Sequence, residues 1–117
     1  MSEPTTAILA TGADSAAHLQ LLRLLERHPE YSQRELADAL GLSLGKTHYV
    51  LHALLDKGLV KIGNFRRSGS KLAYVYLVTP SGLSEKLRLT RNFLARKEAE
   101  FDQLQSTIAE LRAELGR

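Results

Sequence analysis

Residues 32–58 of this 117-residue chain read SQRELADALGLSLGKTHYVLHALLDKG. Ser32 and Glu35 form a capping box, in which the serine hydroxyl accepts a hydrogen bond from the Glu35 amide while the Glu35 side chain reaches back, so a short helix begins here. Gly41 can end that helix because glycine adopts the left-handed conformation at little cost, and Ser43 can cap the next one. Two short helices joined by a tight, glycine-containing turn are typical of a helix-turn-helix.

A further helix is expected before this motif. Asp14 or Ser15 can serve as its N-cap, and it is expected to run to about His28, because Pro29 disfavours helical backbone at the residue before it. Residues 1–13 show no apolar periodicity, and we expect them to form a flexible N-terminal tail.

The periodicity changes after Gly58, where the second helix of the motif is expected to end. Residues 72–79 are rich in β-branched and aromatic side chains and predict a strand, and residues 59–65 can form its partner. The polar segment 66–71 would then be the basic tip of a hairpin. Residues 14–80 are therefore predicted to form a winged helix-turn-helix domain, mainly α with a small β-hairpin. Along the second strand, alternation places three side chains on the face expected to pack against the helices: Tyr74, Tyr76 and Val78.

Residues 81–117 are predicted to form one long dimerisation helix. Thr79 and Pro80 favour a helix start, with Thr as N-cap and Pro at the first helical position. Apolar residues then recur with a heptad spacing typical of a coiled coil, most regularly in the last two heptads. Because so small a domain cannot bury so long an apolar stripe, we expect a homodimer, with its two helices either parallel or antiparallel. The predicted dimerisation residues are Leu87, Leu94, Phe101, Leu104, Ile108, Leu111 and Leu115.

Positive charge is concentrated in the middle of the chain. The formal net charge is +3, but residues 44–71 carry six basic residues against one acidic residue, whereas residues 1–43 carry three against six. A polyanion such as DNA would use this asymmetry. A solvated basic face accounts for the charge of this segment equally well.

The absence of cysteine excludes disulfides, thiolate metal sites and thiol redox sensing. It suits a reducing compartment, and we expect a cytoplasmic protein. No apolar run approaches the roughly 20 residues that a membrane span needs, and residues 1–14 lack the features of a secretory signal. We therefore expect no membrane partner and no cofactor.

Three stretches carry a family resemblance: SQRELA at residues 32–37, LLDKGLV at residues 54–60 and YLVTPSG at residues 76–82. Over about residues 20–90, the chain resembles the MarR-type winged helix-turn-helix transcriptional regulators. It is most similar to the short subfamily associated with exopolysaccharide (EPS) gene clusters. The resemblance implies that a homodimer regulates transcription by binding duplex DNA. The larger relatives hold ligands beside a dimerisation region that this chain lacks in part, so no small-molecule effector is counted among the expected partners.

In a helix-turn-helix the second helix of the motif enters the major groove and reads base edges. If Val50, Leu51 and Leu54 are buried, the opposite face of that helix points outward, while helix N-termini and the hairpin tip can bind phosphates. A two-fold dimer would then bind an inverted repeat whose half-sites lie about 10 bp, or a multiple of it, apart. The predicted DNA-binding residues are Ser32, Ser43, Gly45, Lys46, His48, Tyr49, His52, Arg66, Arg67 and Lys71.

Some of these residues have a simpler interpretation. The two serines are helix caps before they are phosphate contacts, and Tyr49 fits a half-buried packing residue as well as a base contact. His48 and His52 could be solvated side chains without a ligand. The paired arginines of the hairpin tip have no core to pack against, which favours a role in binding.

Two enzymatic or metal-binding interpretations fail on spacing, and we expect neither an enzyme nor a metal site. Residues 41–47 read GLSLGKT, but a P-loop needs four residues between its glycines and must follow a strand. His48, His52 and Asp56 share a helix face, yet three ligands spread over two helical turns suit a single ion poorly. The remaining alternative is a winged helix that docks another protein and binds no DNA.

Overall fold

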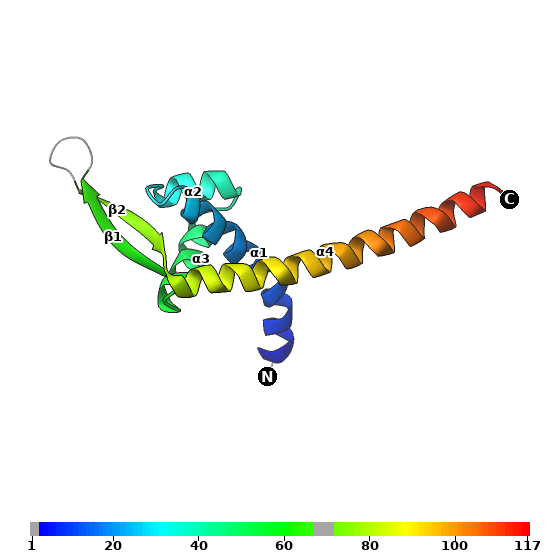
Figure 1. The fold of residues 1–117 in the computed structure, drawn as a ribbon, viewed down its shortest axis with the longest axis horizontal. Coiled ribbons are helices and arrows are strands. Elements are labelled where there is room, and N and C mark those ends of the chain that lie inside the picture. Colours follow the sequence, from blue (N-terminus) through cyan, green and yellow to red (C-terminus); the bar gives the residue numbers. More distant parts are fainter. Residues whose placement is uncertain (1–2, 67–71) are drawn as a thin grey trace.

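The structure, a computed structural model, describes the backbone of residues 3–66 and 72–117, and the side chains of residues 15–64 and 74–117. Within these residues, four helices and one two-stranded antiparallel sheet form a winged helix-turn-helix followed by a long helix, as predicted. Figure 1 shows the hairpin and α2 and α3 gathered at one end of the molecule, with α4 projecting far beyond them. The elements are α1 (Glu3–Arg27), α2 (Gln33–Leu40), α3 (Leu44–Asp56), β1 (Val60–Arg66), β2 (Leu72–Val78) and α4 (Pro80–Leu115).

The first helix begins earlier than the sequence predicts. α1 starts at Glu3 and not near Asp14 or Ser15, so the predicted start of this helix is wrong. Pro4 does not oppose this start, because the first helical turn has no hydrogen bond for its missing N–H to break. Helix formation does not need apolar periodicity, and the three alanines of this segment favour it.

The helix-turn-helix follows the predicted caps. The Glu35 amide donates to the Ser32 hydroxyl over 3.1 Å, and the Ser32 amide donates to the Glu35 carboxylate over 2.8 Å, which completes the capping box. Gly41 ends α2 in the left-handed conformation with φ of 68°. Ser43 then caps α3 by accepting from the Lys46 amide over 3.0 Å. These local bonds fix a short turn, so α2 and α3 pack together.

The core lies where α1, α2, α3 and the base of the hairpin meet. Leu22 of α1, Leu36 of α2 and Leu51 of α3 are completely buried. Their burial supplies the main driving force for folding this small domain. Thr47 is also buried, and its hydroxyl is satisfied by donating to the Ser43 carbonyl over 2.9 Å.

The hairpin packs against the helices only at its base. β1 lies one residue later than predicted, β2 begins as predicted and ends one residue earlier, and Val60 pairs with Val78. Tyr76 is buried and its amide donates to the Pro29 carbonyl over 3.0 Å, which ties β2 to the end of α1. Tyr74, in contrast, is 66% exposed. The prediction that it packs on the helices is wrong, because the hairpin extends past the core before reaching that residue.

One tight junction joins the hairpin to α4. The Thr79 hydroxyl donates to the Gly58 carbonyl over 2.7 Å and accepts from the Gly82 amide over 3.0 Å. The Thr79 amide also donates to the Leu59 carbonyl over 3.0 Å. Gly82 lies so close to this strand start that a Cβ atom there would be 2.1 Å from the Leu59 carbonyl oxygen and 2.8 Å from a Val78 methyl carbon. The first turn of α4 is thus held directly against the backbone that follows α3.

Most of α4 lies outside the domain. Leu89 is buried and Phe93 packs against the core, but no described residue after Phe93 does. Apolar side chains continue along the projecting part, where Phe101 is 58% exposed. Within residues 3–66 and 72–117, no helix combines the length and apolar character that crossing a membrane requires.

The close approach at Gly82 leads to a stability prediction. Replacing Gly82 with alanine is expected to lower the free energy of unfolding by about 3 kcal/mol, because the added carbon meets backbone atoms that cannot turn away. Gly45→Ala is the matched control, since a Cβ atom at that helical position meets nothing within 4 Å. Urea denaturation followed by circular dichroism measures both. Equal stability of the two variants would contradict the proposed constraint.

Candidate nucleic-acid interface

The outward face of α3 carries the polar residues that the sequence predicts. His48, Tyr49 and His52 are exposed, with 57% of the Tyr49 surface accessible. Gly45 is also exposed, and Lys46 is half-buried. This arrangement follows from the buried stripe on the other side of the helix, which consists of Thr47, Val50, Leu51 and Leu54.

Two pairs of side chains on this face hold each other in place. The Lys46 ammonium lies 5.0 Å from the centre of the Tyr49 ring, at cation–π distance. The rings of His48 and His52, one helical turn apart, have centroids 4.1 Å apart. Since all four side chains can donate hydrogen bonds and the tyrosine and histidines can also accept, α3 presents a row of groups suited to base edges.

Gln33 joins this face to the core, a role that sequence reasoning missed. Its amide nitrogen donates to the Tyr76 hydroxyl over 3.4 Å, and its amide oxygen lies 3.1 Å from Nδ1 of His48. The first turn of α2 therefore contacts both the outward face of α3 and the hairpin. The sequence offered no signal beyond the position of Gln33 next to the α2 cap, because the contact depends on how α2 crosses α3.

Ser32 and Ser43 lie at the N-termini of α2 and α3, and both are exposed. Their hydroxyls accept from backbone amides, so the interpretation as caps is confirmed. A helix N-terminus also leaves backbone amides free to bind an anion. A phosphate contact at these serines remains a prediction.

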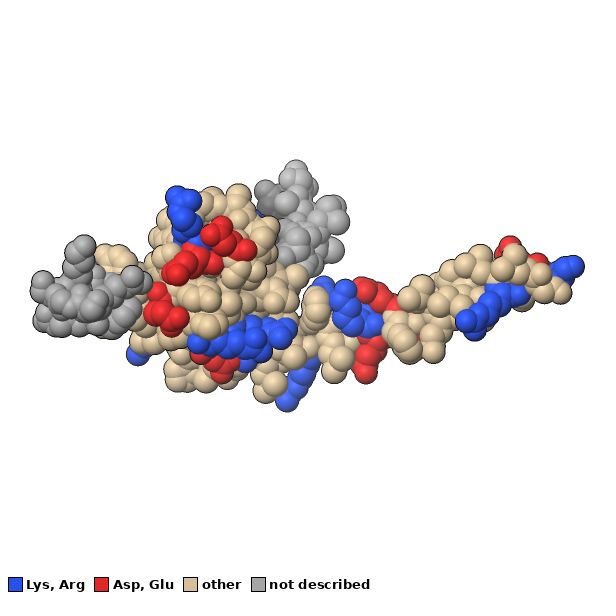
Figure 2. Space-filling model, turned by 90° about the horizontal axis from the view of Figure 1, so that it is seen from above, with Lys and Arg blue, Asp and Glu red and all other residues tan. Residues whose placement is uncertain are grey.

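The predicted basic tip of the hairpin falls largely outside the described part of the chain. Arg67 and Lys71 lie outside the described residues, and Arg66 is described only as the last backbone position of β1. Lys61 is exposed on the same strand. Figure 2 shows both basic and acidic side chains on the domain surface. In the same figure, a patch of basic side chains lies near the place where α4 leaves the domain.

The structure also bears on the P-loop and metal-site interpretations of this region. Residues 41–47 follow α2 and not a strand, so their surroundings are not those of a P-loop. Among the described residues, no three His, Cys, Asp or Glu side chains are grouped closely enough to hold a metal ion.

Comparison with known proteins agrees with the fold described above. Residues 14–61 match a protein-family model described as winged helix-turn-helix DNA-binding. Over these residues the chain is similar to winged helix-turn-helix DNA-binding domains. The matched residues comprise most of α1, both helices of the helix-turn-helix and the start of the wing. No curated protein matches the chain significantly.

Solved structures share the fold of this chain at low sequence identity. A transcriptional regulator homologue from Pyrococcus horikoshii OT3 superposes with a TM-score of 0.55 and 19% identity, covering 72% of this chain and 82% of its own. Staphylococcus aureus MarR, solved with salicylate and kanamycin, superposes with a TM-score of 0.53 and 17% identity. The match covers 82% of this chain and 67% of that protein. A mutant of S. aureus MepR bound to an oligodeoxyribonucleotide superposes with a TM-score of 0.51 and 18% identity. The match covers 84% of this chain and 77% of that protein.

The caps of this winged domain allow a direct test. Ser43→Ala is expected to lower the free energy of unfolding by about 1 kcal/mol, because the Lys46 amide loses its acceptor. Ser43→Asp should retain nearly full stability, since aspartate is also a good cap and its charge suits a helix N-terminus. Thermal unfolding compares the two variants. If Ser43→Asp proves as unstable as Ser43→Ala, the cap is not what holds the start of α3.

Proposed function

We propose that this protein is a transcriptional regulator that binds duplex DNA in a sequence-specific way. The observation that carries the proposal is the exposed face of α3, where Lys46, His48, Tyr49 and His52 lie together on the helix that enters the major groove in this fold. Each of these side chains can bond to base edges, and the helix is held rigidly by its buried opposite face.

The binding unit in this proposal is a homodimer on an inverted repeat. The exposed apolar stripe of α4 supports association through that helix, because a lone copy would leave a series of leucines in water. Two copies related by two-fold symmetry would present two α3 helices to two half-sites. The subfamily resemblance of the sequence adds exopolysaccharide genes as the expected targets.

The alternative is a winged helix that docks a protein partner without binding DNA. The concentration of basic residues in 44–71 favours DNA over this alternative. Selecting bound sequences from a random duplex library with the full chain distinguishes DNA binding from protein docking. Enrichment of one inverted repeat supports the proposal, whereas no enrichment, together with salt-insensitive binding of a protein partner, supports the protein-docking alternative.

The reading face of α3 leads to a prediction about affinity. Lys46→Ala and His52→Ala are each expected to raise the dissociation constant for the selected duplex about five-fold or more, because each removes a hydrogen-bonding group from a base edge. Lys57→Ala is the matched control, because Lys57 is exposed at the opposite end of α3. Fluorescence anisotropy with labelled duplex measures all three variants. Equal affinities for the Lys46 and Lys57 variants would exclude the start of α3 from the interface.

The hairpin tip leads to a separate prediction about salt dependence. Replacing Arg66 and Arg67 with alanine should weaken binding to all duplexes alike, because phosphate contacts carry no sequence information. The slope of log affinity against log salt should become shallower by about 0.9 for each phosphate that the arginines no longer neutralise. Titrations at several salt concentrations measure the slope. An unchanged affinity and slope would remove the hairpin tip from the DNA interface.

A further inference from the structure

We propose that two copies of this chain pack their α4 helices antiparallel, with the C-terminal end of each helix seated in the groove between α1 and α4 of the other copy. This inference rests on the proposed homodimer and specifies its geometry. The sequence pattern alone left parallel and antiparallel packing open. The distribution of charge along α4 and the lining of the groove favour one of them.

The surface to be covered is a continuous stripe along α4. Its apolar members are at least 39% exposed in the single chain, and the stripe as a whole has alternating spacings of three and four residues. Such spacing places them in one line along a coiled-coil partner. Two polar residues, Thr90 and Lys97, complete the line. The apolar members are Leu83, Leu87, Leu94, Phe101, Leu104, Ile108, Leu111 and Leu115.

The two halves of α4 carry opposite charge. Residues 80–97 contain five basic residues and one acidic residue, a net charge of +4, whereas residues 98–115 contain one basic and five acidic residues, a net charge of −4. The one acidic residue of the first half, Glu85, is hydrogen-bonded to Arg88, which lowers the pKa of the Glu85 carboxyl. Parallel packing would set like charges side by side along the whole helix. Antiparallel packing sets each half against its opposite.

The polar residues in the stripe favour the same orientation. In a parallel pair with matching register, Lys97 would face the partner's Lys97, which places two ammonium groups together in the contact. In an antiparallel pair that aligns the stripes, Lys97 faces the partner's Phe101 and Leu87 faces the partner's Leu111. A lysine over a phenyl ring is an attractive contact, and Lys97 already lies 5.1 Å from the centre of the Phe93 ring in the single chain.

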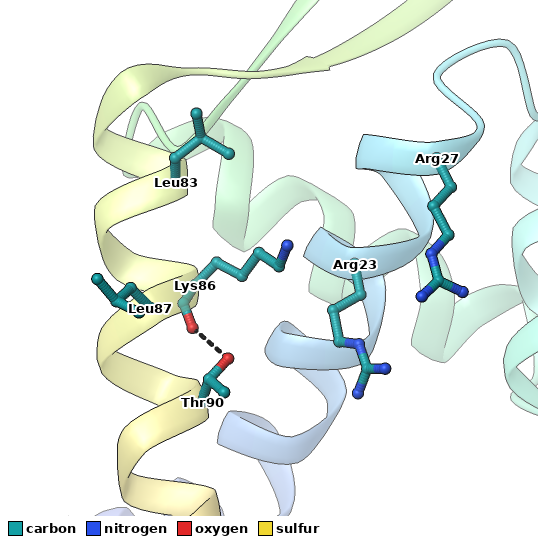
Figure 3. A pocket seen from close by; sticks show the side chains of 6 residues that line it. All are labelled: Arg23, Arg27, Leu83, Lys86, Leu87 and Thr90. Carbon is teal, nitrogen blue, oxygen red and sulfur yellow. Dashed lines mark hydrogen bonds between the residues drawn. The ribbon is translucent and has the colours of Figure 1, made fainter.

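The groove beside the first turns of α4 provides a basic site for the partner's acidic end. Figure 3 shows Lys86 reaching from α4 toward α1, which carries Arg23 and Arg27 one turn apart. Lys86 is paired with Glu26, but Arg23 and Arg27 have no ion-pair partner among the described residues. The groove is lined by Arg23, Arg27, Leu83, Lys86, Leu87 and Thr90.

The end of α4 has the side chains that this groove would bind. In the antiparallel register the partner's Leu111 and the partner's Leu115 pack on Leu87 and Leu83. In the heptad pattern of the stripe, Lys86 and Glu114 both hold position g, directly before Leu87 and Leu115, so they flank the contact on the same side, whereas Glu110 holds position c. The partner's Glu114 therefore lies next to the three basic residues of the groove. Charged residues at such flanking positions form ion pairs between the helices of a coiled coil.

This arrangement also sets the distance between the two winged domains. The midpoint of the paired stripes is near residue 99, so the two α4 start points would be separated along the helix axis by about 57 Å. The domains then lie at opposite ends of the paired helices. Half-sites about two turns of DNA apart fit this distance better than half-sites one turn apart.

Engineered cysteines test the orientation, because the natural chain contains none. Leu87→Cys and Leu111→Cys are prepared in the full chain, alone and as an equimolar mixture, and oxidised gently. Antiparallel packing predicts a disulfide-linked dimer in the mixture only. Ser106→Cys, whose side chain is exposed and lies off the stripe, controls for random collisions and should give no cross-linked dimer under any condition. Efficient cross-linking of Leu87→Cys with itself would overturn the antiparallel arrangement.

A second measurement uses charge and needs no cross-link. Glu114→Lys should raise the dimer dissociation constant about five-fold in sedimentation equilibrium, because both copies lose an attraction to the groove and gain a repulsion. Glu110→Lys makes the same change on the same helix outside the flanking positions and should have little effect. Equal effects of the two variants would overturn the seating of Glu114 in the groove.

The outcomes for orientation and for function are distinguishable. A chain that is monomeric at every concentration would overturn both the antiparallel pair and the proposed homodimer. A dimer that selects an inverted repeat but gives the cross-links of a parallel pair would overturn only the orientation. An antiparallel dimer that selects no DNA sequence would support the orientation and overturn the proposed function.

Discussion

The arrangement of this molecule depends on the contact between the start of α4 and the backbone that follows α3. At this junction the Thr79 hydroxyl bridges the Gly58 carbonyl and the Gly82 amide, while Gly82 lies directly against the Leu59 carbonyl. The junction connects the end of α3, both strands of the hairpin and the first turn of α4. Because every contact in it is made by backbone or by one short side chain, it allows little change in the direction of α4.

This constraint fixes two exposed surfaces of a small domain relative to each other. The exposed face of α3 is held by a buried stripe on its other side, and Gln33 links His48 to the hairpin through Tyr76. The stripe of α4 points into solvent, away from any core of its own chain. A fixed junction between them means that dimerisation through α4 would set the distance and angle between two recognition helices. In the proposed function, the geometry of the dimer therefore selects the spacing of the DNA site.

The charges of the chain are divided in the same way. Basic residues predominate in the central segment that includes α3 and the hairpin, which suits a polyanion. In α4 the net charge is near zero as a whole, but its two halves are of opposite sign. Such a helix has little attraction for DNA along its full length and a strong preference for one orientation of a like helix. The same residue types thus serve different partners according to where along the chain they lie.

The sequence alone determined the elements whose signals are local. The capping box at Ser32, the left-handed turn at Gly41 and the cap at Ser43 each depend on residues within one turn, so the helix-turn-helix, its buried stripe and its exposed polar face could be predicted. Only the tertiary structure decided the rest. In the structure, α1 begins at Glu3 and Tyr74 lies outside the core. Gln33 contacts His48, and Gly82 lies against the Leu59 backbone. These features depend on where one element ends relative to another in space, and spacing along a single chain carries no information about that distance.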